Sequence, residues 1–158
     1  MFVLARAATY STLFIGLLLV FVPGQILAGS GIVRPADLGL LEVVGMVIGA
    51  AGGALALWCI LTFVVVGKGT PAPFDPPRKL VVDGPYRYVR NPMYIGAALA
   101  LGGAALCYRS IALLGYVGLF LIATHLFVVA YEEPALARAF GDDCEAYRVR
   151  VRRWLPRG

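Results

Sequence analysis

The sequence of this 158-residue chain contains few charged residues, and this scarcity restricts the class of protein that it can be. Only 15% of the residues are charged and 60% are hydrophobic, whereas an average soluble domain has about 25% charged residues. A soluble domain of this length does not have enough interior to bury so much apolar surface. The composition therefore predicts a single-domain integral membrane protein.

Potential metal ligands are also scarce. The chain has one histidine and three cysteines, and Cys59, Cys107 and Cys144 form no CxxC pair. A structural zinc site usually takes its ligands from cysteines and histidines at such short spacings. We therefore expect no metal site, and we interpret the cysteines as buried, unreactive thiols.

Signals for nucleotide or nucleic-acid binding are weak. No GxGxxG motif follows a predicted strand, so the fingerprint of a dinucleotide-binding sheet is missing. A net charge of +5 is compatible with nucleic-acid binding. The basic residues, however, lie beside hydrophobic segments, where membrane proteins carry their topology signals. We expect the lipid bilayer as a partner and no nucleic acid.

Long apolar segments dominate the sequence. A helix needs roughly 20 apolar residues to cross a bilayer. We expect an all-α polytopic membrane protein with about four transmembrane helices, at residues 8–28, 38–67, 92–108 and 110–131. The second segment contains Gly45, Gly49, Gly52 and Gly53 at intervals of three and four residues or adjacent to one another, a spacing that lets two helices approach closely. The last two segments form an antiparallel hairpin.

The first apolar segment has two interpretations. Arg6 precedes it, as a basic residue precedes the apolar core of a secretory signal peptide. The apolar stretch is nevertheless long enough for a membrane helix, and Pro23-Gly24 lies where such a helix would kink or end. A cleaved signal and a retained helix are both compatible with this pattern.

The distribution of basic residues predicts an orientation. If all four segments cross the membrane, both termini and the connection at residues 68–91 lie on one side. Every Lys and Arg except Arg34 and Arg109 falls on that side. Basic residues accumulate on the cytoplasmic side of membrane proteins. We therefore expect both termini, residues 68–91 and residues 132–158 in the cytoplasm, with the protein in a bacterial inner membrane.

Residues that can carry chemistry gather around the apolar hairpin. One group runs from Tyr86 through Arg90 to Tyr94, and a second contains His125, Glu132 and Glu133. Each has a structural interpretation as well: tyrosines form interfacial belts, arginines contact lipid headgroups, and glutamates at a helix end can be merely solvated. A lone histidine most often makes a structural hydrogen bond between helices.

Taken in order, these residues resemble the isoprenylcysteine carboxyl methyltransferase family, a group that also includes phospholipid N-methyltransferases. The resemblance covers about residues 68–156. It rests on Gly84-x-Tyr86-x-x-x-Arg90-Asn91-Pro92-x-Tyr94-x-Gly96, then His125, then Glu132-Glu133-x-x-Leu136-x-x-x-Phe140-Gly141-x-x-x-x-x-Tyr147.

The resemblance implies a helical membrane enzyme that transfers a methyl group from S-adenosylmethionine to a lipophilic or small acceptor at the cytoplasmic face, leaving S-adenosylhomocysteine. The cofactor pocket is expected between residues 68–91 and 132–158. The expected catalytic residues are Arg90, Asn91 and Glu132. The expected cofactor-binding residues are Leu80, Val81, Tyr86, Arg90, Asn91, Pro92, Met93, Tyr94, His125, Glu132, Glu133 and Tyr147.

Two positions depart from the pattern of the family. Its best-known members have Arg-His-Pro where this chain has Arg90-Asn91-Pro92, and asparagine can form hydrogen bonds but cannot titrate near neutral pH. Val128 and Val129 occupy the place of an arginine that grips the substrate in prenylcysteine enzymes, which argues against a prenylcysteine substrate.

The residue types suit the cofactor. Arg90 can hold its carboxylate with two hydrogen bonds, Glu132 can bind its ammonium group or ribose hydroxyls, and Tyr86 or Tyr94 can face its sulfonium cation. Two other functions are compatible with the sequence: an NADPH-dependent membrane reductase of the steroid-reductase type, and a non-enzymatic scaffold or carrier anchored by its basic and aromatic rim.

Overall fold

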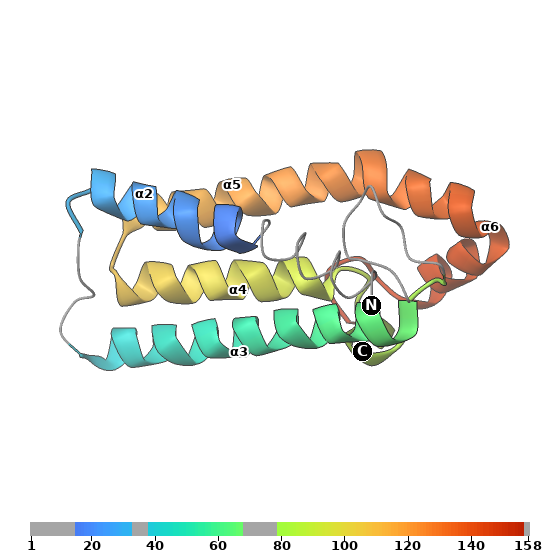
Figure 1. The fold of residues 1–158 in the computed structure, drawn as a ribbon, viewed down its shortest axis with the longest axis horizontal. Coiled ribbons are helices and arrows are strands. Elements are labelled where there is room, and N and C mark those ends of the chain that lie inside the picture. Colours follow the sequence, from blue (N-terminus) through green and yellow to red (C-terminus); the bar gives the residue numbers. More distant parts are fainter. Residues whose placement is uncertain (1–14, 33–37, 68–78, 157–158) are drawn as a thin grey trace.

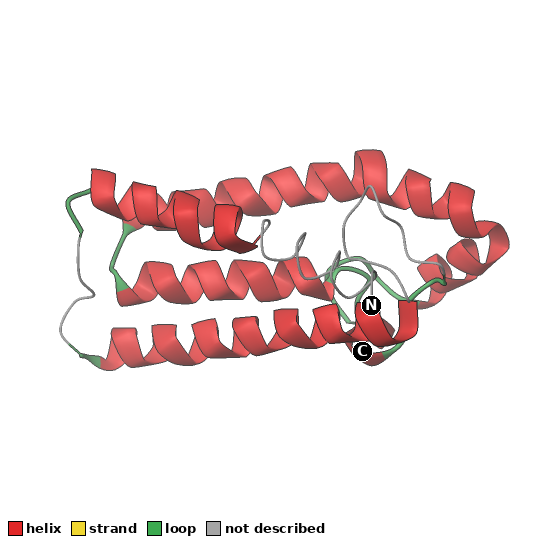
Figure 2. Ribbon diagram, viewed as in Figure 1, coloured by secondary structure: helices red, strands yellow, loops and turns green. Residues whose placement is uncertain are grey.

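A computed structural model describes residues 15–32, 38–67 and 79–156. Within these ranges the chain is helical, and the one pairing of extended backbone is an isolated parallel bridge between Val89 and Arg152 (Figure 2). The all-α class predicted from the sequence is confirmed. Residues 8–14, 68–78 and 157–158 of the predicted segments lie outside the described residues.

The helices follow the apolar segments closely. The π-helical turn η1 (Ile15–Phe21) leads into α2 (Val22–Gly29), and α3 (Leu40–Thr62) continues as η2 (Phe63–Gly67). After the short 3-10 helix η3 (Gly84–Arg87) come α4 (Pro92–Cys107) and α5 (Ile111–Phe127), and α5 continues through η4 (Val128–Glu132) into α6 (Glu133–Arg150). Figure 1 shows α3, α4 and α5 side by side, with α2 against α5.

Two helices are long and apolar enough to cross a membrane, namely Leu40–Gly67 and Ile111–Arg150. Only 17% and 22% of their most apolar windows are buried inside the protein. Because a core helix of a soluble protein would be mostly buried, these exposed apolar surfaces are typical of helices in a bilayer. The two helices are therefore candidate membrane spans, and the full set of four spans remains a proposal.

Helices α3 and α4 pack together through glycines. A Cβ atom built on Gly103 would lie 2.4 Å from the Gly45 carbonyl oxygen and the Gly49 amide nitrogen. One built on Gly52 would lie 2.5 Å from the amide nitrogen of Ala100. The predicted close approach of helices is therefore confirmed for these glycines, whereas Gly53 faces open space.

The end of the bundle opposite α6 is fixed by a buried carboxylate. Glu42, in the first turn of α3, is 1% exposed and accepts hydrogen bonds from the Gly39 N–H at 2.9 Å and from the Arg109 guanidinium. Arg109 belongs to the tight turn between α4 and α5, where it adopts a left-handed φ of 48°. This contact ties the start of α3 to the α4–α5 hairpin.

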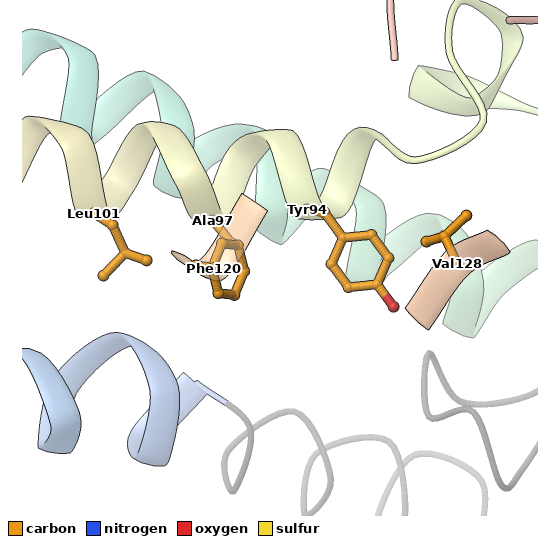
Figure 3. Packing of buried hydrophobic residues seen from close by; sticks show 5 residues of the cluster. All are labelled: Tyr94, Ala97, Leu101, Phe120 and Val128. Carbon is orange, nitrogen blue, oxygen red and sulfur yellow. The ribbon is translucent and has the colours of Figure 1, made fainter. Parts of the chain in front are cut away.

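Each helix of the hairpin begins at a residue that favours a helix start. Pro92 begins α4, where its missing N–H costs nothing. Ser110 caps α5, because its Oγ accepts a hydrogen bond from the Leu113 N–H at 3.2 Å. Between α4 and α5 lies an apolar cluster, which Figure 3 shows: Tyr94, Ala97, Leu101, Phe120 and Val128.

Beyond the bundle, α6 reverses the chain. Gly141 has φ 50° and ψ −124°, a conformation open mainly to glycine, and it breaks α6 into two helical pieces. Figure 1 shows α6 extending past the end of α4 and then turning back toward it. The bend brings Val89 beside Arg152, so the C-terminal residues meet the segment that precedes α4.

The glycine contact predicts unequal effects of alanine at two adjacent positions of α4. Gly103→Ala should destabilise the protein by about 1–3 kcal/mol, because its Cβ would collide with the α3 backbone. Gly102→Ala is the matched control: nothing lies within 4 Å of its Cβ position, so it should be neutral or stabilise slightly. Thermal unfolding in detergent measures both, and equal effects would contradict the packing described.

Candidate functional site

A pocket lies where the end of α3, the segment before α4, η4 and α6 meet. Its volume is about 540 Å³ when the space at its solvent-open mouth is included. Apolar side chains form much of its wall, and four charged side chains reach it. It is lined by Phe63, Leu80, Val81, Tyr86, Arg90, Asn91, Val128, Glu132, Glu133, Leu136, Cys144, Tyr147 and Arg148.

The wall before α4 is held by contacts with α3 and α6. Gly84, with a left-handed φ of 58°, starts η3 close to α3, where a Cβ would lie 3.0 Å from the Thr62 hydroxyl oxygen. The buried Tyr86 ring packs edge-on against Phe63, with ring centroids 5.2 Å apart. The Tyr147 hydroxyl donates a hydrogen bond of 2.7 Å to the Tyr86 carbonyl oxygen. The second half of α6 therefore fixes the position of this wall.

Glu133 is the centre of a cluster of three arginines. Its carboxylate accepts two hydrogen bonds from Arg153, from Nε at 2.7 Å and from Nη2 at 2.9 Å. Arg90 Nη1 lies 3.1 Å from Oε1, and Arg148 Nη2 lies 3.5 Å from Oε2. Burial works against ionisation of Glu133, but the Arg153 hydrogen bonds and the positive charges of all three arginines hold the pKa of Glu133 below its usual value.

Arg90 has donors that this cluster does not use. Its side chain is 14% exposed. Its buried Nε and Nη1 atoms make no hydrogen bond with any described residue; the contact of Nη1 with Glu133 is close enough for an ion pair but is not aligned as a hydrogen bond. Burial lowers the pKa of Arg90, and the nearby Glu133 opposes this, so the guanidinium stays charged. Unused buried donors on a charged side chain favour an anionic ligand group.

Glu132 faces the same pocket with a different partner. Tyr94 donates a hydrogen bond from its hydroxyl to Glu132 Oε2 at 3.0 Å. Glu132 follows directly after the apolar run that ends at Tyr131. Burial raises the pKa of Glu132, the Tyr94 hydrogen bond opposes the rise, and the charge of Glu133 adds to it. The adjacent glutamates thus have pKa values shifted in opposite directions.

Residues 151–154, which we call the C-terminal segment, run beside the start of α4. The Arg90 N–H donates to the Arg152 carbonyl oxygen at 2.9 Å, and the Asn91 side-chain amide donates to the Arg153 carbonyl oxygen at 3.3 Å. At its end, the indole N–H of Trp154 donates to Nδ1 of His125 at 3.0 Å. The segment therefore joins the residues before α4 to those of α5.

A family model described as phospholipid methyltransferase matches residues 40–143, more than half of the chain. The chain belongs to the phospholipid methyltransferase family. Comparisons with curated proteins and with solved structures gave no match. Membership in this methyltransferase family confirms the resemblance drawn from the sequence and indicates methyl transfer in a membrane setting.

The structure of this family member brings most of the residues expected at the cofactor site into one pocket. Those lining it are Leu80, Val81, Tyr86, Arg90, Asn91, Glu132, Glu133 and Tyr147. Pro92 and Met93 instead begin α4, and Tyr94 lies in the apolar cluster with its hydroxyl on Glu132. His125 is exposed and lies outside the pocket, bonded to Trp154. That position gives no support to cofactor binding by His125.

Five pocket residues were not anticipated. Leu136 follows Glu132 by four residues, and Cys144 precedes Tyr147 by three, so helical spacing around the motif would have indicated both. Arg148 directly follows Tyr147 in the sequence, so the motif also indicated its place near the pocket. Phe63 and Val128 enter the wall through tertiary packing of η2 and η4, which no local pattern indicates.

The lowered pKa of Glu133 predicts a pH dependence of stability. A carboxylate with a depressed pKa stabilises the fold above its unfolded-state pKa of about 4.3, and this contribution is lost as the pH falls through the folded-state pKa. Glu133→Gln should lower the stability at pH 7 by about 3 kcal/mol, because Arg90 and Arg153 lose the carboxylate that they share, whereas Arg148 keeps its pair with Glu145. It should also reduce the loss of stability on acidification, measured as the unfolding temperature from pH 7 to pH 3.

Glu145→Gln is the control for this experiment. Its carboxylate is 67% exposed and pairs with Arg148 on the surface of α6, so its removal should change stability by less than about 0.5 kcal/mol. A profile for Glu133→Gln that overlays the parent protein at every pH would contradict the role of Glu133 as the centre of the cluster.

Proposed function

We propose that this chain uses S-adenosylmethionine to methylate a lipophilic or small acceptor at the cytoplasmic face of the membrane. Methyl transfer follows from the family, which conventionally uses this donor. The observation that carries the proposal is that one pocket is lined both by Arg90, which has unused buried donors, and by the carboxylate of Glu132. These two groups match the carboxylate and the ammonium group of the amino-acid part of the cofactor.

The charges of the pocket define the orientation of the ligand. Arg90 would hold the carboxylate through a charge-assisted hydrogen bond from its unused Nε or Nη1 donor. Glu132 would hold the ammonium group or a ribose hydroxyl. The adenosine part would lie against the apolar wall, where Leu80, Val81 and Leu136 line the pocket.

When bound, S-adenosylmethionine supplies an activated methyl group on its sulfonium. The protein then has to orient that group and exclude water, and positioning of this kind can supply several kcal/mol of the barrier reduction. Asn91 donates its amide to the Arg153 carbonyl oxygen, so its side-chain oxygen remains as an acceptor. Asn91 therefore orients and does not act as a base.

The Tyr94–Glu132 hydrogen bond gives the acceptor a direction of approach. It joins the pocket to the apolar cluster between α4 and α5. An acceptor arriving from the lipid would reach this pair past the apolar cluster, because the Tyr94 side chain is buried. Glu132 is also the carboxylate in the pocket whose raised pKa suits it to take a proton from a protonated acceptor.

The topology belongs to the same proposal. With four membrane spans, the pocket, both termini and nearly all Lys and Arg residues fall on one side. Basic residues accumulate on the cytoplasmic side. We therefore propose that the pocket opens to the cytoplasm of a bacterial cell and that the protein lies in its inner membrane.

S-adenosylhomocysteine, the product form, tests the site directly. We expect the purified protein in detergent to bind it, as measured by titration calorimetry. Glu132→Gln, which keeps the shape and an acceptor for Tyr94, should weaken binding roughly 10- to 100-fold, because it removes a charged hydrogen-bond partner. Asp142→Asn, which changes an exposed carboxylate of α6, is the matched control and should bind like the parent.

The outcomes of this titration separate the alternatives. No heat at millimolar S-adenosylhomocysteine, or binding of NADPH that competes with it, would overturn the proposal. If Glu132 is the binding carboxylate, affinity also falls as the pH drops through its raised pKa, above the ordinary glutamate value of about 4.3. Glu132→Gln should lack that dependence.

A further inference from the structure

The C-terminal segment lies beyond the matched family region of residues 40–143, yet it contacts the residues that form the pocket. It follows α6 in extended conformation, since Val151 has φ −119° and ψ 128°. Its backbone pairs with Arg90 and Asn91, and its Arg153 side chain reaches Glu133. The Arg153 side chain can therefore influence the charged groups that line the pocket.

Arg153 occupies both oxygens of the Glu133 carboxylate. Its Nε bonds Oε1 at 2.7 Å and its Nη2 bonds Oε2 at 2.9 Å, which is the paired geometry that guanidinium and carboxylate groups favour. Arg90 approaches the same carboxylate with Nη1 at 3.1 Å but forms no aligned hydrogen bond with it. Arg153, and not Arg90, thus forms the paired hydrogen bond to both oxygens of Glu133.

This competition has a consequence for Arg90. If Arg153 were absent, Glu133 could form the paired geometry with Arg90, which is already within ion-pair distance. One of the two donors that now remain unused, Nε or Nη1, would then be satisfied inside the protein. A ligand carboxylate would have to displace Glu133 in order to reach them.

We propose that Arg153 is a positioning residue: by holding Glu133 in a paired hydrogen bond, it keeps the donors of Arg90 open to the carboxylate of the ligand. The inference rests on the proposed function, because that ligand is the amino-acid part of S-adenosylmethionine. It concerns only this part, so the adenosine half should bind independently of Arg153.

Two ligands separate this role from a structural one. S-adenosylhomocysteine carries the amino acid, whereas 5′-methylthioadenosine has the same nucleoside and thioether without it. Arg153→Ala should weaken S-adenosylhomocysteine binding about tenfold or more and leave methylthioadenosine binding within about twofold of the parent. Arg153→Lys, which cannot bond both oxygens in a plane, should show a smaller loss with the same selectivity.

A double variant gives the sharpest result. In Arg153→Ala combined with Glu133→Gln, Glu133 can no longer capture Arg90, so S-adenosylhomocysteine affinity should recover relative to Arg153→Ala alone. A structural role predicts that the double variant binds as weakly as the single one or more weakly. Arg152→Ala is the matched control, because its side chain is exposed and its contact with Arg90 is made by the backbone.

Each outcome of these binding measurements either supports or overturns the proposal. Selective loss of S-adenosylhomocysteine binding with recovery in the double variant supports the proposal. Unchanged affinity, or equal loss for both ligands without recovery, overturns it while leaving the proposed function intact. If Arg153→Ala does not fold, as judged by thermal unfolding, Arg153→Lys decides by the same comparison. A parent protein that binds neither ligand overturns the proposed function itself, and this inference with it.

Discussion

The carboxylate of Glu133 is the contact on which the geometry of the pocket depends. It joins Arg90 of the segment before α4, Arg148 of α6 and Arg153 of the C-terminal segment. The group is buried and could not remain charged there without these partners. Arg148 also pairs with Glu145, whereas Arg90 and Arg153 both pair with Glu133. Glycine contacts between α3 and α4 and the Glu42–Arg109 pair at the far end hold the scaffold on which this cluster is built.

Much of the scaffold follows from local patterns. Apolar length located the helices, Pro92 marked the start of α4, and the intervals of Gly45, Gly49 and Gly52 indicated a close helix contact. The ordered motif from Tyr86 to Tyr147 predicted the family and most residues that line the pocket. These signals succeed because each depends on neighbours within one or two helical turns, or on residue types in a fixed order.

The rest depends on contacts between residues far apart in the chain. Glu133 is the expected type of partner for an arginine, but Arg148 and Arg153 reach it only because α6 bends back at Gly141. The hydrogen bond between the Asn91 side chain and the Arg153 carbonyl oxygen joins positions 62 residues apart, and no periodicity in residues 151–154 predicts it. His125 has polar chemistry at the right depth, yet its partner is Trp154 and its position is outside the pocket. Sequence indicates which groups are present, whereas the fold decides which of them meet.

Hydrogen–deuterium exchange of the protein in detergent, with and without saturating S-adenosylhomocysteine, tests the central claim that one ligand contacts both walls of the pocket. Ligand binding should slow amide exchange in residues 80–91 and in residues 132–154 together, since both segments line the pocket or support it. Exchange in residues 105–115, at the opposite end of the bundle, should not change. Protection of one wall alone, or of the opposite end, would contradict a site shared between the two segments.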